Sequence, residues 1–374
     1  MLTIEEDALV FGFPEVHEKA KAAINFQITL RIPDDTKEYP LPPGLGRFPL
    51  RHAEDFKGKV PKQWVDRGGV MLPMHKAEAM WIAFDRGDDS YPCAVKIAAG
   101  KINAVSGKPW SPELDAGDTD YLVMPQQPWL DGFAVGTGQI RQFVAMPLGG
   151  GYTAEEQITG KAEWGGLQII VYPMKRERWE EMERIRLEQE RLRREEEARC
   201  RAEAAKQRPM LYCLAGLDDD DMARSSGLRD RSKMVNCERK GAPRGGASRL
   251  EATAMGLGAG GRMRQEVYRD SYGIEAWDQS VSSRCFLTLV DAEDWAAITG
   301  EELRRKPPTA QDYAKYGLPW FDYAAKGQEA LAGAEALTML KTVGEVAEGK
   351  GLDPLPGNET VDPGPLVKLG PDAA

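Results

Sequence analysis

The stretch MGLGAGGRMRQEVYRD, residues Met255 to Asp270, decides which fold class the chain belongs to. Gly256, Gly258 and Gly261 have the G-x-G-x-x-G spacing of a dinucleotide-binding loop. Such a loop follows a buried strand and precedes a helix, whose N-terminus faces the phosphates. Here the preceding residues, ASRLEATAM, are polar, and the following RMRQEVYRD alternates like a strand. We therefore interpret the stretch as a glycine turn that leads into a strand at Arg262–Tyr268.

A second segment of the chain, GTGQIRQFV, is similar to this stretch. Its residues Gly138, Arg141, Gln142 and Val144 align without gaps on Gly261, Arg264, Gln265 and Val267. We expect both segments to be glycine turns or bulges that lead into strands. Cross-strand hydrogen bonding is the simpler use of the repeated arginine and glutamine, and a shared polar site is the alternative.

The remaining pattern predicts an α+β, β-rich fold with an N-terminal antiparallel β domain, a long charged helix and a small C-terminal α+β module. We expect the β-rich domain at 1–174, the charged spacer helix at 175–208, a flexible linker at 209–249, the small module at 250–345 and a disordered tail at 346–374. Apolar runs between glycine and proline turns predict strands at Phe26–Ile32, Met80–Asp85, Ala94–Ala99, Tyr121–Met124, Gln139–Met146, Leu167–Tyr172 and Arg284–Val290. Helices are predicted at Pro14–Ala23, Asp291–Gly300 and Thr309–Gly317, and within 326–345.

Residues 175–208 consist mostly of glutamate and arginine in blocks, with no glycine or proline before Pro209. Opposite charges three or four residues apart stabilise an isolated helix. Trp179, Met182 and Ile185 form a short apolar stripe at the start of this segment, and the stripe fades beyond Leu192. We therefore expect a spacer helix that docks through its first turns, with weak self-association as the alternative.

Composition limits the class of protein. The chain has 374 residues and a formal net charge of −10, which argues against nucleic acid as a partner. Its five cysteines never form a C-x-x-C pair and its three histidines all lie near the N-terminus, so we expect no metal site and no cofactor. The first residues lack a signal-peptide pattern, and no apolar run reaches the roughly 20 residues of a membrane span. We therefore expect a cytoplasmic protein that does not enter a membrane.

The sequence contains few single residues that would be expected to react or to bind a metal. His75 is the one histidine beside a strongly apolar run, and a structural hydrogen bond is its simpler role. Cys285 lies within an apolar strand and is interpreted as a core residue. The serine-nucleophile motif G-x-S-x-G and the phosphate loop are both absent from the sequence.

The densest set of ligand-competent side chains lies in PWSPELDAGDTDYLVMPQQPWLDG, residues 109–132. Aromatic faces beside carboxylates suit a carbohydrate, because a sugar stacks its C–H face on a ring and donates its hydroxyls to acceptors. Paired carboxylates could also hydrolyse a glycoside, and a polar surface turn is the simplest alternative. The ligand-binding candidates are Trp110, Asp115, Asp118, Asp120, Tyr121, Trp129 and Asp131, with Glu113 beside them.

Several segments, among them PLPPGLGRFPL, RQFVAMPLGGGYT and GAGGRMRQEVYRD, resemble a family of bacterial proteins without an assigned activity. The resemblance covers most of the chain outside the charged helix and the linker. It implies a bacterial origin and a shared architecture, and it transfers no site residue.

These observations predict a non-catalytic, cytoplasmic binding or assembly protein, with another protein or a second copy of the chain as its partner. The first alternative is a carbohydrate-binding or carbohydrate-processing protein that uses the Trp110–Asp131 region. The second alternative is a nucleotide-dependent enzyme that uses the Gly256–Gly261 motif.

Overall fold

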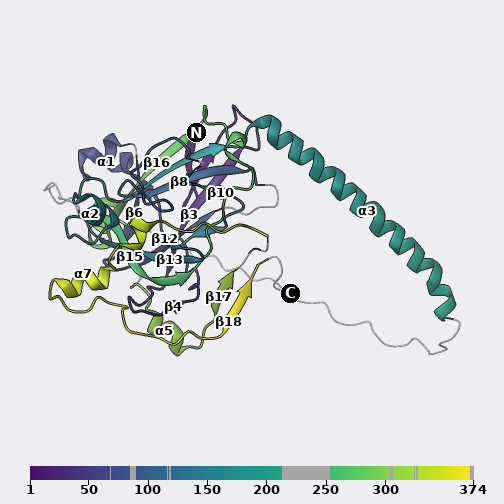
Figure 1. Cartoon of the computed structure of the whole chain (residues 1–374). Coiled ribbons are helices and arrows are strands. Elements are labelled where there is room, and N and C mark those ends of the chain that lie inside the picture. Colours follow the sequence, from purple (N-terminus) through teal and green to yellow (C-terminus); the bar gives the residue numbers. More distant parts are fainter. Residues whose placement is uncertain are drawn as a thin grey trace, which may run out of the picture. The chain divides into compact units, whose positions relative to one another are not determined.

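The computed structural model of the chain describes residues 1–67, 69–84, 90–115, 117, 119–212, 253–303, 306–323, 325 and 327–370, with 205–212 as backbone. The fold is α+β and β-rich, as the sequence predicts, with a large antiparallel sheet, a long helix and a small two-stranded sheet with short helices near the C-terminus (Figure 1). The described residues of Met1–Trp179 and Arg249–Ala374 form one compact unit, and those of Glu180–Ser248 form another.

The large sheet has one continuous path of hydrogen-bonded strands. Its order is β1 (Leu2–Glu5), β2 (Ala8–Gly12), β3 (Lys21–Thr29), β7 (Ala79–Phe84), β13 (Gln139–Pro147), β15 (Ala254–Arg264), β16 (Ser283–Asp291), β14 (Leu167–Pro173), β8 (Cys93–Ala99) and β10 (Leu122–Met124). Shorter strands join this path: β4 (Glu38–Tyr39), β5 (Arg51–His52), β6 (Val70–Met74), β9 (Ile102–Asn103), β11 (Trp129–Leu130) and β12 (Gly132–Gly136). Within this sheet the pairing is antiparallel except where β4 meets β15 and β6 meets β16.

The glycine-rich stretch lies inside β15, so the expected glycine turn is wrong. Its glycines let other segments pack directly against the strand: a Cβ atom on Gly258 would lie 2.6 Å from the carbonyl oxygen of Tyr152. One on Gly261 would lie 2.2 Å from the carbonyl oxygen of Pro33. The strand ends at Arg264, and the described residues 265–273 contain no helix. The loop-and-helix geometry that a dinucleotide phosphate needs is therefore not formed there.

The two similar glycine-containing segments pair with each other. β13 and β15 are antiparallel neighbours, with Ile140 opposite Met263 and Arg141 opposite Arg262. Gly138 has a φ of +69° and occupies the turn before β13, as expected for a turn glycine. Gly261, its counterpart in the alignment, instead lies within the strand.

The structure confirms strands at each of the seven predicted places, although their ends differ by a few residues. The helix predicted at Pro14–Ala23 is wrong, because these residues form turns and then the start of β3. In β3 the buried positions alternate along the strand, and the strand pairs with β2 and β7. These tertiary contacts override the helix propensity of Ala20, Ala22 and Ala23.

The expected separation into a domain at 1–174 and a module at 250–345 is also wrong. β15 and β16 lie between β13 and β14 in the order of the large sheet, so the C-terminal strands complete the N-terminal sheet. Each of these pairings joins residues more than a hundred positions apart, which a local pattern does not reveal.

Short helices and a second sheet follow β16. The α-helices after β16 are α4 (Ala292–Thr299), α5 (Ala310–Lys315), α6 (Glu335–Thr338) and α7 (Val343–Gly349). Two short α-helices, α1 (Lys62–Asp66) and α2 (Ala154–Thr159), and the long charged helix precede β16. α4 and α5 confirm the helices predicted at Asp291–Gly300 and Thr309–Gly317, and the side chains of Asp291 and Thr309 cap them. Residues 326–345 contain α6 and only the start of α7. β17 (Trp320–Tyr323) pairs in parallel with β18 (Leu366–Leu369). The disordered tail predicted at 346–374 is therefore wrong for its described part, where Leu355 and Val361 are buried.

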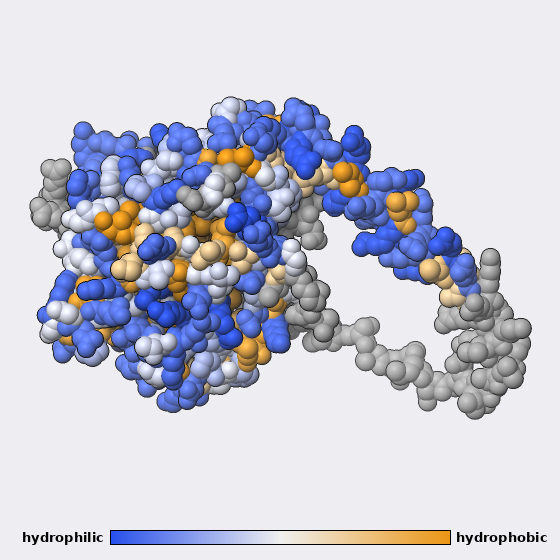
Figure 2. Space-filling view, in the orientation of Figure 1, coloured by the Kyte–Doolittle hydropathy of each residue, from blue (hydrophilic) through white to orange (hydrophobic). Residues whose placement is uncertain are grey.

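The charged helix is confirmed as α3 (Arg176–Tyr212), and most of the predicted linker lies outside the described residues. Trp179 in its first turn contacts the rings of His17 and Tyr91, with ring centroids 4.3 and 5.2 Å away. Ion pairs three and four residues apart follow, such as Arg186 with Glu183 and Arg194 with Glu190. On the face drawn in Figure 2 the helix is mostly hydrophilic, with separated hydrophobic residues.

Candidate functional site

The structure distributes the sequence-predicted site residues over three places. Asp115 and Asp120 belong to a polar cluster around Lys96, Tyr121 contacts Asp270, and Trp129 and Asp131 line a cavity. Trp110 is half-buried and its backbone N–H donates to the carbonyl of Lys101. Asp118 lies outside the described residues.

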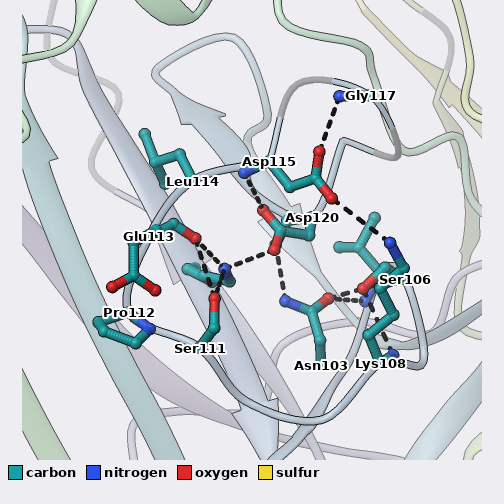
Figure 3. Close-up of polar contacts among 12 residues, drawn as sticks. Asn103, Ser106, Lys108, Ser111, Pro112, Glu113, Leu114, Asp115, Gly117 and Asp120 are labelled. Carbon is teal, nitrogen blue, oxygen red and sulfur yellow. Dashed lines mark hydrogen bonds and ion pairs between the residues drawn. The ribbon is translucent and has the colours of Figure 1, made fainter.

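The polar cluster surrounds Lys96, a central residue of β8. Figure 3 shows loop residues of this cluster, among them Ser111, Asp115 and Asp120. The Lys96 side chain is 1 % exposed and forms an ion pair with Asp120. Its ammonium group also donates to the backbone carbonyl of Glu113 and to Oγ of Ser111. Asp120 in turn accepts the backbone N–H of Asp115 at 3.0 Å. The carboxylate of Asp115 accepts the backbone N–H of Gly117 at 2.9 Å and pairs with Lys108 at 3.4 Å. Both carboxylates therefore have structural partners within the protein.

Tyr121 is an interior residue that joins two parts of the chain. Its hydroxyl donates to Oδ2 of Asp270 at 2.7 Å, and the same oxygen accepts Nε1–H of Trp277 at 2.8 Å. Burial and the neighbouring carboxylate raise the pKa of Tyr121. The residue therefore acts as a hydrogen-bond donor within the core.

Trp129 and Asp131, by contrast, line a cavity of about 280 Å³. The other lining residues come from several distant segments: Leu41, Pro42, Pro43, Gly44, Trp81, Phe321 and Leu369. Trp81 and Trp129 are both half-buried, and their rings meet edge to face with centroids 6.0 Å apart. Trp129 has a second ring contact, with Tyr323, at a centroid distance of 4.8 Å.

Two buried polar atoms of the cavity have no hydrogen-bond partner among the described residues. They are Oδ1 of Asp131 and Nε1 of Trp81. Asp131 is 4 % exposed, and burial raises the pKa of its carboxyl to about 8, against the opposing effect of a hydrogen bond with the Trp129 side chain. The carboxyl is therefore mostly protonated at neutral pH, so the cavity offers one indole donor and one neutral carboxyl group.

The glycine-rich stretch helps to position this site. After β15, the side chain of Gln265 accepts the backbone N–H of Asp131 at 3.0 Å and donates to the carbonyl of Trp129 at 3.3 Å. On the other side of the cavity, Gly44 lies so close to Trp81 that a Cβ atom would be 2.9 Å from the indole ring. The absence of a side chain at Gly44 lets the proline-rich segment at 41–44 cover Trp81.

Sequence reasoning missed Trp81, Phe321 and the segment Leu41–Gly44. Trp81 lies in AMWIAF, where alternate residues of β7 are buried and the tryptophan points to the less buried side. That alternation was the available signal, because a large aromatic residue on the more exposed face of a strand often marks a contact surface. The proline-rich segment Leu41–Gly44 has no comparable feature in the sequence, because its prolines and glycine predict only a turn.

The cavity suits binding better than catalysis. Asp131 is the single titratable side chain among its described lining residues. A glycoside hydrolase of the usual kind needs a second carboxyl group at a defined separation. The cavity instead provides three aromatic side chains, other apolar walls, one indole N–H donor and one carboxyl group.

Among the described residues, no helix combines the length and the apolar character that crossing a membrane requires. No family model matches the chain, and no curated protein or solved structure matches it either. The resemblance noted in the sequence stays a hypothesis.

Proposed function

We propose that the chain is a carbohydrate-binding protein that holds one sugar residue in the cavity between Trp81 and Trp129. The observation that carries the proposal is the pair of unpartnered polar atoms, Nε1 of Trp81 and Oδ1 of Asp131, in an otherwise apolar site. One sugar hydroxyl can accept a hydrogen bond from the indole N–H, and it can also form a hydrogen bond with the carboxyl group. A ligand without such a group would leave both atoms unsatisfied, which costs about 1–3 kcal/mol for each.

The shape and polarity of the cavity support the same ligand class. Half-buried tryptophan rings provide faces on which the C–H side of a sugar ring stacks. A volume of about 280 Å³ suits a single sugar residue rather than an oligosaccharide. We therefore expect recognition of the end of a chain or of a free monosaccharide.

A glycan array followed by tryptophan fluorescence tests the proposal. The array identifies the sugar, and titration of that sugar should change the emission of the cavity tryptophans. Trp129→Ala and Asp131→Ala should each weaken binding about tenfold or more, because the first removes a stacking face and the second removes the hydrogen-bonding carboxyl group. The matched control is Trp110→Ala, which removes a half-buried tryptophan from the same sequence region but outside the cavity.

Two results would contradict the proposal. One is the absence of binding to any sugar on the array by a folded protein. The other is binding that survives both cavity substitutions, which would place the sugar elsewhere.

Self-association through the charged helix and a cytoplasmic location also stay predictions. Light scattering after size-exclusion chromatography tests the first, and a strict monomer at high concentration would contradict it.

A further inference from the structure

A second cavity, of about 530 Å³, shares no lining residue with the tryptophan cavity. Its polar walls come from the end of β3, the turn before β7, the start of α4 and the segment before α5. The side chains on which the argument depends are Arg31, His75, Glu78, Asp291, Glu293 and Lys306. We propose that this cavity binds a small zwitterion of the amino-acid type, with one carboxylate and one ammonium group.

Arg31 supplies the first observation, because its guanidinium group is 3 % exposed but incompletely bonded. One terminal nitrogen donates to the carbonyl of Pro356 at 2.8 Å, and the other pairs with Asp34 at 2.6 Å. Its Nε–H has no partner among the described residues. A buried N–H of a cation is costly to leave without an acceptor, so this atom is available to a ligand oxygen.

His75 supplies an independent second observation. Its Nε2 is buried and also has no hydrogen-bond partner in the described part of the chain. Its backbone N–H donates to Oε2 of Glu78 at 2.8 Å, which fixes the turn that leads into β7. A guanidinium N–H and an imidazole nitrogen in one cavity are groups that bind a carboxylate.

The other charges of the cavity decide between a simple anion and a zwitterion. Besides Arg31 and His75, the wall contains the cations Lys76 and Lys306 and the carboxylates of Glu78, Asp291 and Glu293. Asp291 already accepts the backbone N–H of Glu293 at 2.9 Å as the cap of α4. An anion alone would meet three carboxylates, whereas an ammonium group on the same ligand would be attracted by them. The mixed wall therefore favours a ligand with both charges.

Imidazole NMR of the full chain provides a direct test, because the chain has only three histidines and His→Gln variants assign their signals. The probes are the twenty common amino acids in pools, the amines that correspond to them without the carboxylate, and the acids without the amino group. We expect one or more amino acids to shift the His75 signals while those of His17 and His52 stay in place. The matching amine and acid should bind at least about tenfold more weakly, because each lacks one of the two charges.

Substitutions distinguish a direct role of His75 in binding from a general effect on folding. His75→Gln should weaken amino-acid binding about tenfold while leaving the His17 and His52 signals unchanged. The control His52→Gln changes a half-buried histidine of β5 outside the cavity and should leave binding unchanged. Failure of every amino acid to shift His75 would overturn the proposal, and so would equal affinity for the acid alone. Neither result depends on whether the tryptophan cavity binds sugar.

Discussion

Gln142 and Gln265 occupy matching positions in two similar segments, and each bridges a neighbouring stretch of backbone with the same pair of hydrogen bonds. Gln142 accepts the N–H of Ile32 and donates to the carbonyl of Leu30, both at 2.8 Å. Gln265 accepts the N–H of Asp131 and donates to the carbonyl of Trp129. In both cases a side-chain amide replaces a strand partner for two backbone groups that are two residues apart.

Loss of the Gln265 amide should therefore loosen the tryptophan cavity. Gln265→Ala leaves the backbone N–H of Asp131 without its acceptor, at a cost of about 1–3 kcal/mol, whereas the carbonyl of Trp129 keeps the Gln127 amide as a donor at 2.9 Å. We expect a lower free energy of unfolding in urea and weaker binding of whichever sugar the glycan array identifies.

Gln142→Ala is the matched control for this variant. It should lower the free energy of unfolding at least as much, because Gln142 bonds both the N–H of Ile32 and the carbonyl of Leu30. Its effect on sugar affinity should be small, since Leu30 and Ile32 do not line the tryptophan cavity. Equal loss of sugar affinity in both variants would show that Gln265 has no particular role at the site.

The glycines of β15 should be intolerant of side chains. Gly258→Ala would place a methyl group 2.6 Å from the Tyr152 carbonyl oxygen and 2.6 Å from Cγ1 of Val343. We expect destabilisation of roughly 1–3 kcal/mol, as for other overpacked cores. The control is Gly12→Ala at the end of β2, where the nearest atom would be 3.8 Å away. A Gly258→Ala variant as stable as Gly12→Ala would contradict the packing explanation of the G-x-G-x-x-G spacing.

Most individual strands could be predicted because their alternation is local. At the end of β15 and just after it, Met263 and Gln265 are buried and Arg262 and Arg264 are exposed, which agrees with the strand-like alternation of RMRQEVYRD. The sequence could not show that the glycines belong to the same strand, because glycine has no side chain whose polarity would indicate a buried or an exposed face. Their role depends on Pro33, Tyr152 and Val343, which approach from distant segments.

Only part of the candidate site could be predicted, because its residues come from both local and distant segments of the chain. Trp129 and Asp131 lie two residues apart, so a sequence window groups them, whereas Trp81 and Phe321 reach the cavity only through sheet pairing and the packing of β17. The same window grouped Asp115 and Asp120 with them, although these residues interact with Lys96 and its loop. Grouping residues by their proximity in sequence therefore assigned to the tryptophan cavity residues that lie elsewhere.

The buried pair of Lys96 and Asp120 should stabilise the loop at 111–120. Lys96→Met would leave the carboxylate of Asp120 buried without its cation, which typically costs about 3–5 kcal/mol. We expect urea denaturation to show this loss. The double variant Lys96→Met/Asp120→Leu should recover part of it, because no unpaired charge remains. A double variant that loses the sum of the two single effects would contradict a direct coupling between these residues.

Asp131 should make stability depend on pH in a direction opposite to that of an ordinary ion-paired carboxylate. Its pKa is about 8 in the folded chain, against about 3.9 for an aspartate in an unfolded chain. Between these values the folded state keeps a proton that the unfolded state releases, so the free energy of unfolding falls as pH rises. The contribution is fully present below about pH 4 and is lost as pH rises through 8.

The substitution Asp131→Asn removes this titration. Its free energy of unfolding should therefore rise relative to that of the wild type by up to about 1.4 kcal/mol per pH unit between pH 5 and 7. Urea denaturation at several pH values measures this difference, with the exposed Asp353→Asn as control. A difference between Asp131→Asn and wild type that stays constant with pH would contradict a neutral buried carboxyl in the tryptophan cavity.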